Sequence, residues 1–402
     1  MKACNTIIIL ALAAFSVIQA NAQKLPKREA ILQAMELANE YFIIQHPDAG
    51  APTYVKKMRP SNLWTRGVYF EGLSALIDIE EQTGSAKYTT NLNYMNDWGT
   101  AHQWTPRNGT KTRNADDYCC SQTYIWWYEK HADKDISTLN PSIECMNNTI
   151  ATPESLHDWT WIDAIQMGLP VLTGLSRIEA TVNFNDDYAR FAEQGWKMYT
   201  WTRDTLAGGL FNKEEGLWWR DKDFIPPYKE PNGRNCYWSR GNGWVYAALV
   251  RAMKDIEAIP VVFCYGVDYN NHFDEYKADY MKMTTALLAC QREDFFWNAS
   301  LHDESDFGGK ELTGTSLFTY GLAWGVNQGW ITDKKVKKTI IATWNALVND
   351  CLHTNGFLGF VQGTGKQPSD SQPVTYDSEP DFDDFGLGCF LLAGSEIYKM
   401  AK

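Results

Sequence analysis

The 402-residue sequence predicts an all-α protein built from helical hairpins. Apolar residues recur at the three- and four-residue spacing of amphipathic helices along almost the whole chain. Strand-like alternation is scarce, and the predicted helices are even in number, which favours stacked helix pairs. No Gly-, Ser- or Pro-rich linker and no run of like charges divides the chain. We therefore expect residues 23–402 to form a single domain.

The first predicted helix runs from about residue 28 to residue 44. It carries Ile31, Met35 and Ala38 at helical spacing. The same spacing predicts further helices over residues 64–82, 86–102, 117–131, 137–149, 160–178, 186–206, 243–258, 271–290, 315–329, 334–352 and 384–399. Short β-ribbons are expected in the loop over residues 207–240.

The N-terminus predicts export. Lys2 precedes an apolar run over residues 7–14, and an Ala-x-Ala site at residues 20–22 lies just before Gln23. This order is typical of a secretory signal peptide over residues 1–22, removed on the way to the periplasm or the cell exterior. A membrane anchor is disfavoured, because the apolar run is too short to span a bilayer.

Charge and cysteine usage exclude several classes of protein. The formal net charge of −12 disfavours binding to nucleic acid and insertion into anionic membranes. Eight of the nine cysteines follow the predicted cleavage site, with no C-x-x-C pair and no histidine at metal spacing, so we expect no metal site. Export permits disulfides. The apolar surroundings nevertheless favour buried free thiols at Cys119, Cys120, Cys145, Cys236, Cys264, Cys290, Cys351 and Cys389.

The stretch WSRGNGW, from Trp238 to Trp244, predicts an anion site. A helix is expected to begin near Gly243, with Asn242 as its N-cap. The backbone N–H groups of a helix start, with Arg240 beside them, form a binding site for an anion. The alternative is an arginine that stacks between indole rings for structure alone.

The stretch WTWIDAIQMGLP, residues 159–170, contains a candidate general acid. Asp163 lies beside an apolar helical stripe and follows Trp161 closely. A carboxyl group in such surroundings loses solvation, which raises its pKa and keeps it protonated near neutral pH. A general acid needs this property. The alternative is an aspartate that caps a helix or pairs with an arginine.

Asp116 and Asp117 begin another predicted helix. Acidic residues are favoured there by the helix dipole alone, without any catalytic role. A second carboxylate across a cleft from Asp163 would nevertheless complete an acid/base pair.

Six stretches carry a resemblance to a known family over about residues 117–398. In order they read NADDYCCSQTY, WIDAIQMGLPV, GLWWRD, WSRGNGW, TGTSLFTYGLAWGVNQGW and DFGLGCFLLAGSEIY. Together they resemble the unsaturated uronyl hydrolases of glycoside hydrolase families 105 and 88. The resemblance implies an (α/α)6 barrel of six helical hairpins. It also implies an enzyme without metal or organic cofactor that hydrates the C4=C5 double bond of an unsaturated uronic acid at the non-reducing end of an oligosaccharide.

The resemblance also assigns roles to residues. Asp163 matches the catalytic aspartate, as general acid/base, and either Asp116 or Asp117 matches the second acidic position. The expected substrate-binding residues are Arg240, Trp238, Trp244, Trp161 and Arg220.

One departure leaves the glycan open. Members that act on rhamnogalacturonan often carry a histidine where this chain has Arg220 and Asp221. An arabinogalactan side chain or a glucuronate polymer is therefore an alternative source of the substrate. Two other functions also stay open on this scaffold, an inverting glycosidase that uses the same carboxylates and a non-catalytic sugar-binding protein.

Overall fold

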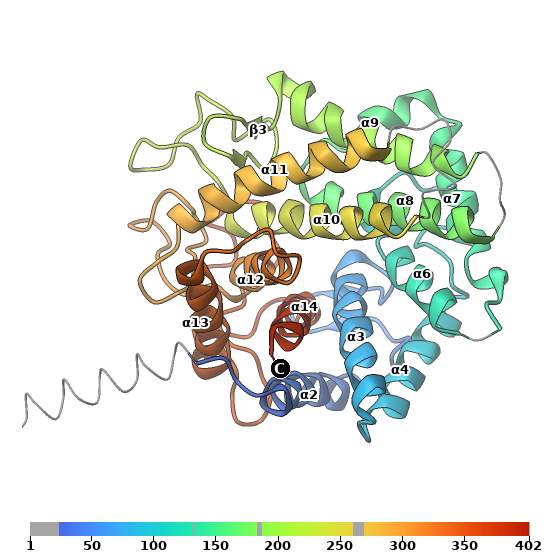
Figure 1. Ribbon diagram of the computed structural model, residues 1–402, viewed down its shortest axis with the longest axis horizontal. Coiled ribbons are helices and arrows are strands. Elements are labelled where there is room, and N and C mark those ends of the chain that lie inside the picture. The colour runs from blue at the N-terminus through green and yellow to red at the C-terminus, as the bar shows by residue number, and fades with distance from the viewer. Residues whose placement is uncertain (1–23, 132, 183–186, 260–268, 402) are drawn as a thin grey trace, which may run out of the picture.

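The computed structural model describes residues 24–131, 133–182, 187–259 and 269–401 (Figure 1). The predicted signal peptide, residues 1–22, and Cys264 lie outside the described residues. Among the described helices, none is both long and apolar enough to cross a membrane.

Long helices of the described residues form two concentric layers (Figure 1). The inner ring consists of α3 (Trp64–Thr83), α6 (Ser121–Lys130), α8 (Asp163–Val182), α10 (Ser239–Glu257), α12 (Leu312–Asn327) and α14 (Asp384–Met400). Each inner helix packs against the next, and α14 packs against α3, which closes the ring. The outer layer consists of α2 (Arg28–Gln45), α4 (Tyr88–Ala101), α7 (Asn140–Ile150), α9 (Ala189–Asp204), α11 (Tyr269–Ala289) and α13 (Lys334–Cys351). Outer and inner helices alternate along the chain, so the predicted all-α class and (α/α)6 barrel are confirmed.

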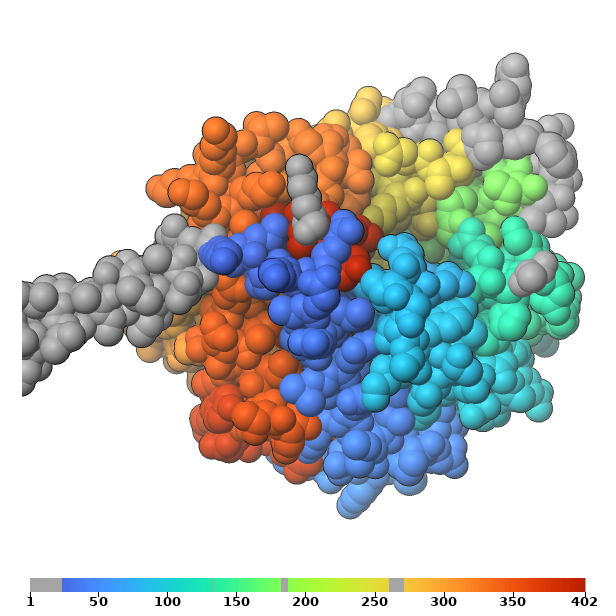
Figure 2. Space-filling model, turned by 60° about the horizontal axis from the view of Figure 1, so that its bottom comes forward, coloured from blue at the N-terminus to red at the C-terminus, as the bar shows by residue number. Residues whose placement is uncertain are grey.

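Ring closure depends on a close contact between α3 and α14. A Cβ atom built on Gly388 would lie 2.2 Å from the carbonyl oxygen of Val68, and one built on Gly72 would lie 2.5 Å from the carbonyl oxygen of Gly388. Only glycine lets two helix backbones approach this closely. As a result, the N-terminal segments (blue) lie directly against the C-terminal segments (red) on the face shown in Figure 2.

Two helix boundaries differ from the predicted ones. Helix α10 begins at Ser239, so the predicted start near Gly243 and the N-cap role of Asn242 are wrong. The Asn242 side chain instead accepts a hydrogen bond from Trp218 N (2.8 Å) and donates one to Trp218 O (3.0 Å). The predicted helix over residues 117–131 is divided into α5 (Ala115–Tyr118) and α6.

Two short hairpins lie outside the helical layers. The pair β3 (Phe211–Asn212) and β4 (Leu217–Trp218) confirms the predicted ribbon within residues 207–240. The pair β1 (Thr53–Tyr54) and β2 (Met58–Arg59) was not predicted. In this hairpin Thr53 pairs with Arg59, and Tyr54 pairs with Met58.

The described cysteines confirm the prediction of free thiols. All of them are unpaired, and all are buried except Cys290, which is partly exposed. Burial raises the pKa of the Cys120 thiol to about 12, so it is protonated and a poor nucleophile at neutral pH.

Candidate active site

A pocket of about 400 Å³ lies where the inner helices begin. Its wall combines the start of α3, the turn before and within α5, the first turns of α8, the segment after β4 and the segment before α14. The lining residues are Arg59, Leu63, Trp64, Arg107, Asn114, Asp116, Trp161, Asp163, Met167, Arg220, Thr364 and Gly365. The pocket therefore joins the predicted residues Asp116, Asp163, Trp161 and Arg220, which are far apart in the sequence.

Asp163 is the first residue of α8 and is 9% exposed. Just before it, Ile162 N donates to Arg220 O (3.0 Å), in a short backbone pairing of 161–162 with 220–221. This pairing places Arg220 Nε 3.0 Å from Asp163 Oδ2. Asp163 therefore lies beside the predicted apolar neighbours Trp161 and Met167, but it also has a guanidinium partner, the alternative weighed from the sequence. Arg220 also contacts Asp221 Oδ2 (2.7 Å).

Asp116 is the carboxyl group of the pocket that favours the protonated form. Burial raises its pKa, the negative charges of Asp163 and Asp117 raise it further, and Arg220 and Arg59 oppose them, with a net pKa of about 7. The negative charge of Asp163 acts directly on Asp116 and favours a proton there. With a pKa of about 7, Asp116 carries a proton in about half of the molecules at neutral pH.

Asp117 does not belong to the pocket lining, and this decides between the two adjacent aspartates. Its side chain accepts hydrogen bonds from Arg107 (2.9 Å), Asn108 (2.9 Å) and Thr112 (2.7 Å). It is 2% exposed, which leaves no free face for a ligand. The predicted catalytic role of Asp117 is thus corrected to a structural one, which fixes the loop before α5 and orients Arg107.

Arg240 is also displaced from its predicted role. Its guanidinium is 1% exposed and donates to Gln362 O (2.6 Å) and Gly363 O (2.7 Å), while it lies 4.5 Å from the centre of the Trp238 ring. It does not line the pocket. The structural alternative therefore describes Arg240 better: it holds the segment that leads into Thr364 and Gly365.

The two tryptophans of the WSRGNGW stretch are likewise buried behind the residues that line the pocket. Trp238 donates from Nε1 to Gln362 Oε1 (2.9 Å), and Trp244 meets the ring of Trp64 edge-on, with centroids 6.2 Å apart. Both are buried, so neither presents a face to the pocket. The aromatic lining comes instead from Trp161, as predicted, and from Trp64, which sequence reasoning missed.

Two of the other missed lining residues, Arg59 and Arg107, lie before the first recognised motif, and Asn114 is the first residue of that motif. Arg59 belongs to the short β1–β2 hairpin, and Arg107 and Asn114 belong to the loop before α5. No periodicity or motif distinguishes Arg59 and Arg107 in the sequence. Only the ring closure, which brings residues 59–64 beside residues 364–365, reveals them.

Two coupled carboxyl groups in a pocket, one with a pKa near neutrality, define a candidate acid/base site. The profile of glycosyl hydrolase family 88 matches residues 34–401, and the chain belongs to this family. The predicted family is therefore confirmed.

Relatives and solved structures agree with this membership. An unsaturated 3S-rhamnoglycuronyl hydrolase from Formosa agariphila is 28% identical over 356 residues, which cover 84% of this chain and 85% of that protein. A glycosyl hydrolase family 88 structure from Bacteroides vulgatus is 27% identical, with a TM-score of 0.77 over 93% of this chain and 99% of that one. A structure named as a polysaccharide lyase is 26% identical, with a TM-score of 0.77 over 93% of this chain and 98% of that one.

Proposed function

We propose that the protein removes a 4,5-unsaturated uronic acid from the non-reducing end of oligosaccharides by hydrating the C4=C5 bond. The observation that carries this proposal is Asp116, whose pKa of about 7 lets it carry a proton near neutral pH, beside Asp163 in a pocket that also contains arginines. Family membership and the name of the Formosa relative support the same activity.

The chemistry divides between the two carboxyl groups. The double bond of an unsaturated uronate is a vinyl ether, so protonation at C4 leaves a positive charge shared between C5 and the ring oxygen. Protonated Asp116 supplies this proton, and the Asp163 carboxylate accepts a proton from the water that adds to C5. The product is a hemiketal, which opens and releases the neighbouring sugar. The sequence assigned both proton transfers to Asp163; the pKa of about 7 at Asp116 supports a division between the two residues.

A rhamnose is the leaving sugar we favour. The Formosa relative is named for a rhamnoglycuronyl substrate and aligns over most of both chains. The partner is therefore an anionic oligosaccharide, with the uronate in the pocket and the rhamnose toward its mouth.

An ultraviolet assay tests the activity. The full chain is incubated with lyase-generated unsaturated disaccharides that carry either rhamnose or another sugar next to the uronate. Loss of the conjugated-alkene absorbance with release of the neighbouring sugar supports the proposal, and faster loss with rhamnose supports the leaving group. Cleavage of saturated uronides alone would favour the inverting glycosidase. Binding of the disaccharides without turnover would favour the sugar-binding protein.

The lyase among the similar structures favours a second candidate, β-elimination of an intact uronide. The same kind of pocket could serve it, because elimination needs a cation at the carboxylate and an acid/base pair at C5 and C4. The two reactions have opposite optical signatures. A lyase creates the conjugated alkene, so absorbance rises with a saturated polymer; the proposed hydrolase consumes it.

We infer that the chain is exported and cleaved before Gln23. The basic, apolar and Ala-x-Ala order of residues 1–22 supports this. N-terminal sequencing of protein recovered from periplasm and medium tests it. A chain that keeps residues 1–22 in the cytoplasmic fraction would contradict export.

A further inference from the structure

The three arginines of the pocket differ in their partners. Arg220 is paired with Asp163 and Asp221, and Arg107 is paired with Asp117 (2.9 Å). The guanidinium of Arg59 has no hydrogen bond or ion pair with any other residue in the part of the chain that the structure describes, although its backbone is paired with Thr53. Its guanidinium lies 4.4 Å from the centre of the Phe382 ring and 6.0 Å from that of Trp64. Among the described residues, Arg59 is thus the pocket arginine that has no direct ion pair with a carboxylate, although its charge lowers the pKa of Asp116.

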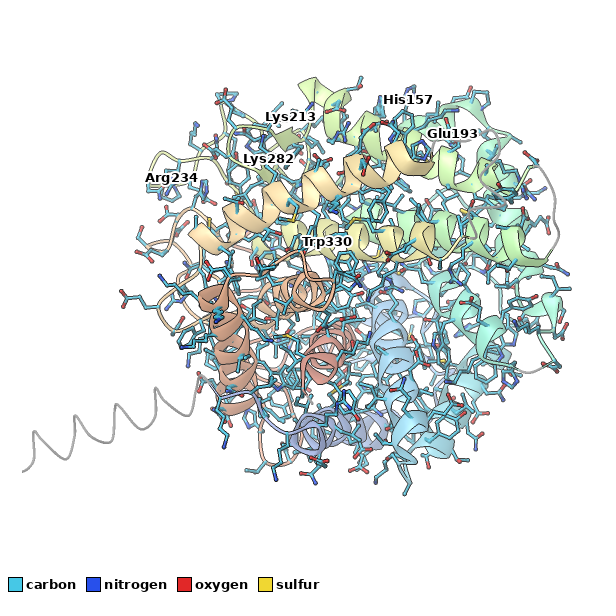
Figure 3. The ribbon with its side chains drawn as sticks, in the orientation of Figure 1. His157, Glu193, Lys213, Arg234, Lys282 and Trp330 are labelled. Carbon is cyan, nitrogen blue, oxygen red and sulfur yellow. The ribbon has the colours of Figure 1, made fainter. Side chains whose placement is uncertain are left out.

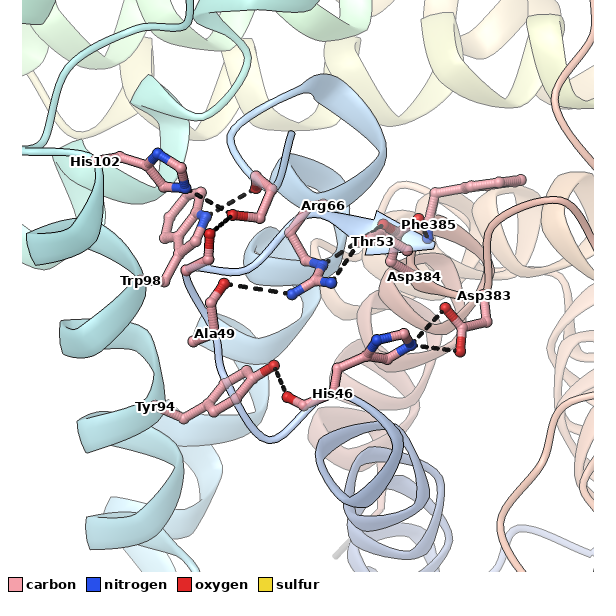
Figure 4. Close-up of polar contacts among 12 residues, drawn as sticks. His46, Ala49, Thr53, Arg66, Tyr94, Trp98, His102, Asp383, Asp384 and Phe385 are labelled. Carbon is pink, nitrogen blue, oxygen red and sulfur yellow. Dashed lines mark hydrogen bonds and ion pairs between the residues drawn. The ribbon is translucent and has the colours of Figure 1, made fainter. Parts of the chain in front are cut away.

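Arg59 is held in place through its cross-strand partner in the hairpin. Thr53, its cross-strand partner, donates to Asp384 Oδ2 (3.3 Å) and accepts a hydrogen bond from Arg66 (Figure 4). Arg66 and Asp384 are both buried, and they connect the first turns of α3 and α14. The hairpin is therefore fixed to two inner helices, which lowers the entropy lost when Arg59 binds a ligand.

The loop that faces the hairpin is fixed as well. Lys56 Nζ, at the hairpin tip, donates to Glu379 O. Thr364 N donates to Asp381 Oδ1 (2.7 Å), and Arg240 holds the preceding carbonyl groups. Both walls beside Arg59 are thus formed before any substrate arrives.

We propose that Arg59 binds the carboxylate of the terminal uronate, an inference that rests on the proposed function of the pocket. In an unsaturated uronate the carboxylate is attached to C5, one of the two carbons that react. Arg59 is close enough to Asp116 for its charge to act on that carboxyl group, so it lies near the reacting bond. A guanidinium binds a carboxylate through two parallel hydrogen bonds, which fixes the sugar ring as well as its charge. Phe382 and Trp64 contact the guanidinium and leave these donors free.

A sulfate ester on the leaving sugar would offer similar anionic oxygens. It is separated from C5 by the glycosidic bond and the neighbouring ring, so it would lie farther from Asp116. The two sources are therefore distinguishable with substrates that differ only in sulfation.

The test compares Arg59→Ala and Arg59→Lys with Arg234→Ala. Arg234 is an exposed arginine that lines a different cavity, near the edge of the molecule in Figure 3. With an unsaturated, sulfate-free disaccharide, we expect kcat/KM of Arg59→Ala to fall about 10- to 100-fold, mostly through KM, because a charge-assisted bidentate contact is lost. Arg59→Lys keeps the positive charge but cannot form two parallel hydrogen bonds to a carboxylate, so its decrease in kcat/KM should be intermediate. Added guanidinium should restore part of the activity of Arg59→Ala, and Arg234→Ala should equal the wild type.

A binding measurement separates this inference from the proposed reaction. Calorimetry with saturated glucuronate and with glucose compares a carboxylate-bearing sugar with a neutral one. The wild type should prefer glucuronate, Arg59→Ala should lose that preference, and ionic strength should weaken the wild-type preference more than that of the variant. If the wild type never consumes the alkene yet shows this preference, the reaction is wrong and the Arg59 contact stands.

Three results would overturn the inference. The first is an unchanged KM in Arg59→Ala, and the second is an equal loss of glucose and glucuronate binding. The third is a loss seen only with sulfated disaccharides, which would assign Arg59 to the leaving sugar. Circular dichroism shows whether the alanine variant folds. If it does not, Arg59→Lys is tested instead. An unchanged KM and an unchanged preference for glucuronate in the lysine variant would exclude a bidentate contact between Arg59 and the carboxylate.

Discussion

The two ends of the helical ring differ in how their charges are matched. At the end where the inner helices begin, the pocket contains Asp163, Asp116 with its raised pKa, and Arg59, whose guanidinium has no ion pair with any described residue. At the opposite end, a cavity of about 220 Å³ is lined by later turns of the same helices. There Arg251 is paired with Glu71, Arg177 with Asp255 (2.9 Å), and Lys254 with Glu396 (2.7 Å).

The contrast is visible in two buried carboxyl groups. Burial alone raises the pKa of Glu396, but Lys254 and Lys399 lower it to about 2, so Glu396 is a permanent anion. At Asp116 burial and neighbouring anions prevail, and the pKa is about 7. The same scaffold thus uses compensated charges to stabilise one end and uncompensated charges for chemistry at the other.

The largest expected effect is the loss of turnover in Asp163→Asn or Asp116→Asn. Each variant removes one member of the acid/base pair, so kcat should fall about 100- to 10,000-fold. Circular dichroism should show the wild-type fold in both. Asp97→Asn, at an exposed site on the outer helix α4, serves as the control and should retain full activity. Near-normal turnover in either pocket variant would remove that residue from the mechanism.

At the opposite end, Glu396→Gln should reduce stability and leave the intrinsic reaction intact. The folded pKa of about 2, below the usual 4.5, means that this carboxylate contributes about 3 kcal/mol to the free energy of unfolding at pH 7. The contribution is present above pH 4.5 and is lost as the pH falls toward 2, so the two proteins should converge there. Urea unfolding at several pH values measures this. Glu81→Gln, which removes an exposed partner of Lys130, should change stability little.

A smaller effect should appear in the titration of Asp116 itself. Asp163→Asn removes one of the charges that raise the pKa of Asp116, so that pKa should fall below about 7. In the wild type, activity should decline as the pH rises through about 7, because the acid loses its proton. Carbon NMR of labelled aspartate follows the titration, and an unchanged value in the variant would show that the two groups are not coupled.

The smallest effect concerns Glu80, a buried carboxyl group away from both cavities. Burial raises its pKa to about 7, while a hydrogen bond from Asn91 opposes the rise. A raised pKa means that wild-type stability falls as the pH increases from 4.5 to 7, because the folded state resists ionisation. Glu80→Gln stays neutral, so it should be more stable than the wild type above pH 7. We expect a gain of about 1 kcal/mol in the free energy of unfolding, because the cost of burying the new amide N–H group offsets part of the benefit. Equal stability at pH 8 would mean that Glu80 ionises without cost.

The helices could be predicted from the sequence because their signal is local. The spacing of apolar residues within each segment determines which face of that helix is buried. The predicted ranges 28–44, 64–82 and 384–399 accordingly fall within a few residues of α2, α3 and α14. The order of hairpins then follows from the even alternation of helices. The β1–β2 hairpin was not predicted, since no periodic pattern marks residues 53–59.

The site was only partly predictable, because the hydrogen-bond partners of each polar side chain come from loops that are distant in the sequence. Asp116 and Asp117 are adjacent, and only the bonds from residues 107–112 decide which of them faces the pocket. Arg240 was assigned to the ligand from its neighbours, but carbonyl groups more than a hundred residues away bind it. Asp163 and Trp161 were identified correctly as pocket residues, because the start of α8 is itself the wall.

The glycine contact between α3 and α14 has a consequence for synthesis of the protein. Helix α14 leaves the ribosome after all the other inner helices, and in the folded protein it packs against both α3 and α12. Until residues 384–400 emerge, the apolar surfaces of α3 and α12 that α14 covers in the folded protein are exposed. These surfaces must be shielded from other chains. A chain that is exported before it folds would meet the same requirement on the far side of the membrane. There, chaperones would have to cover these apolar surfaces until residues 384–400 have crossed.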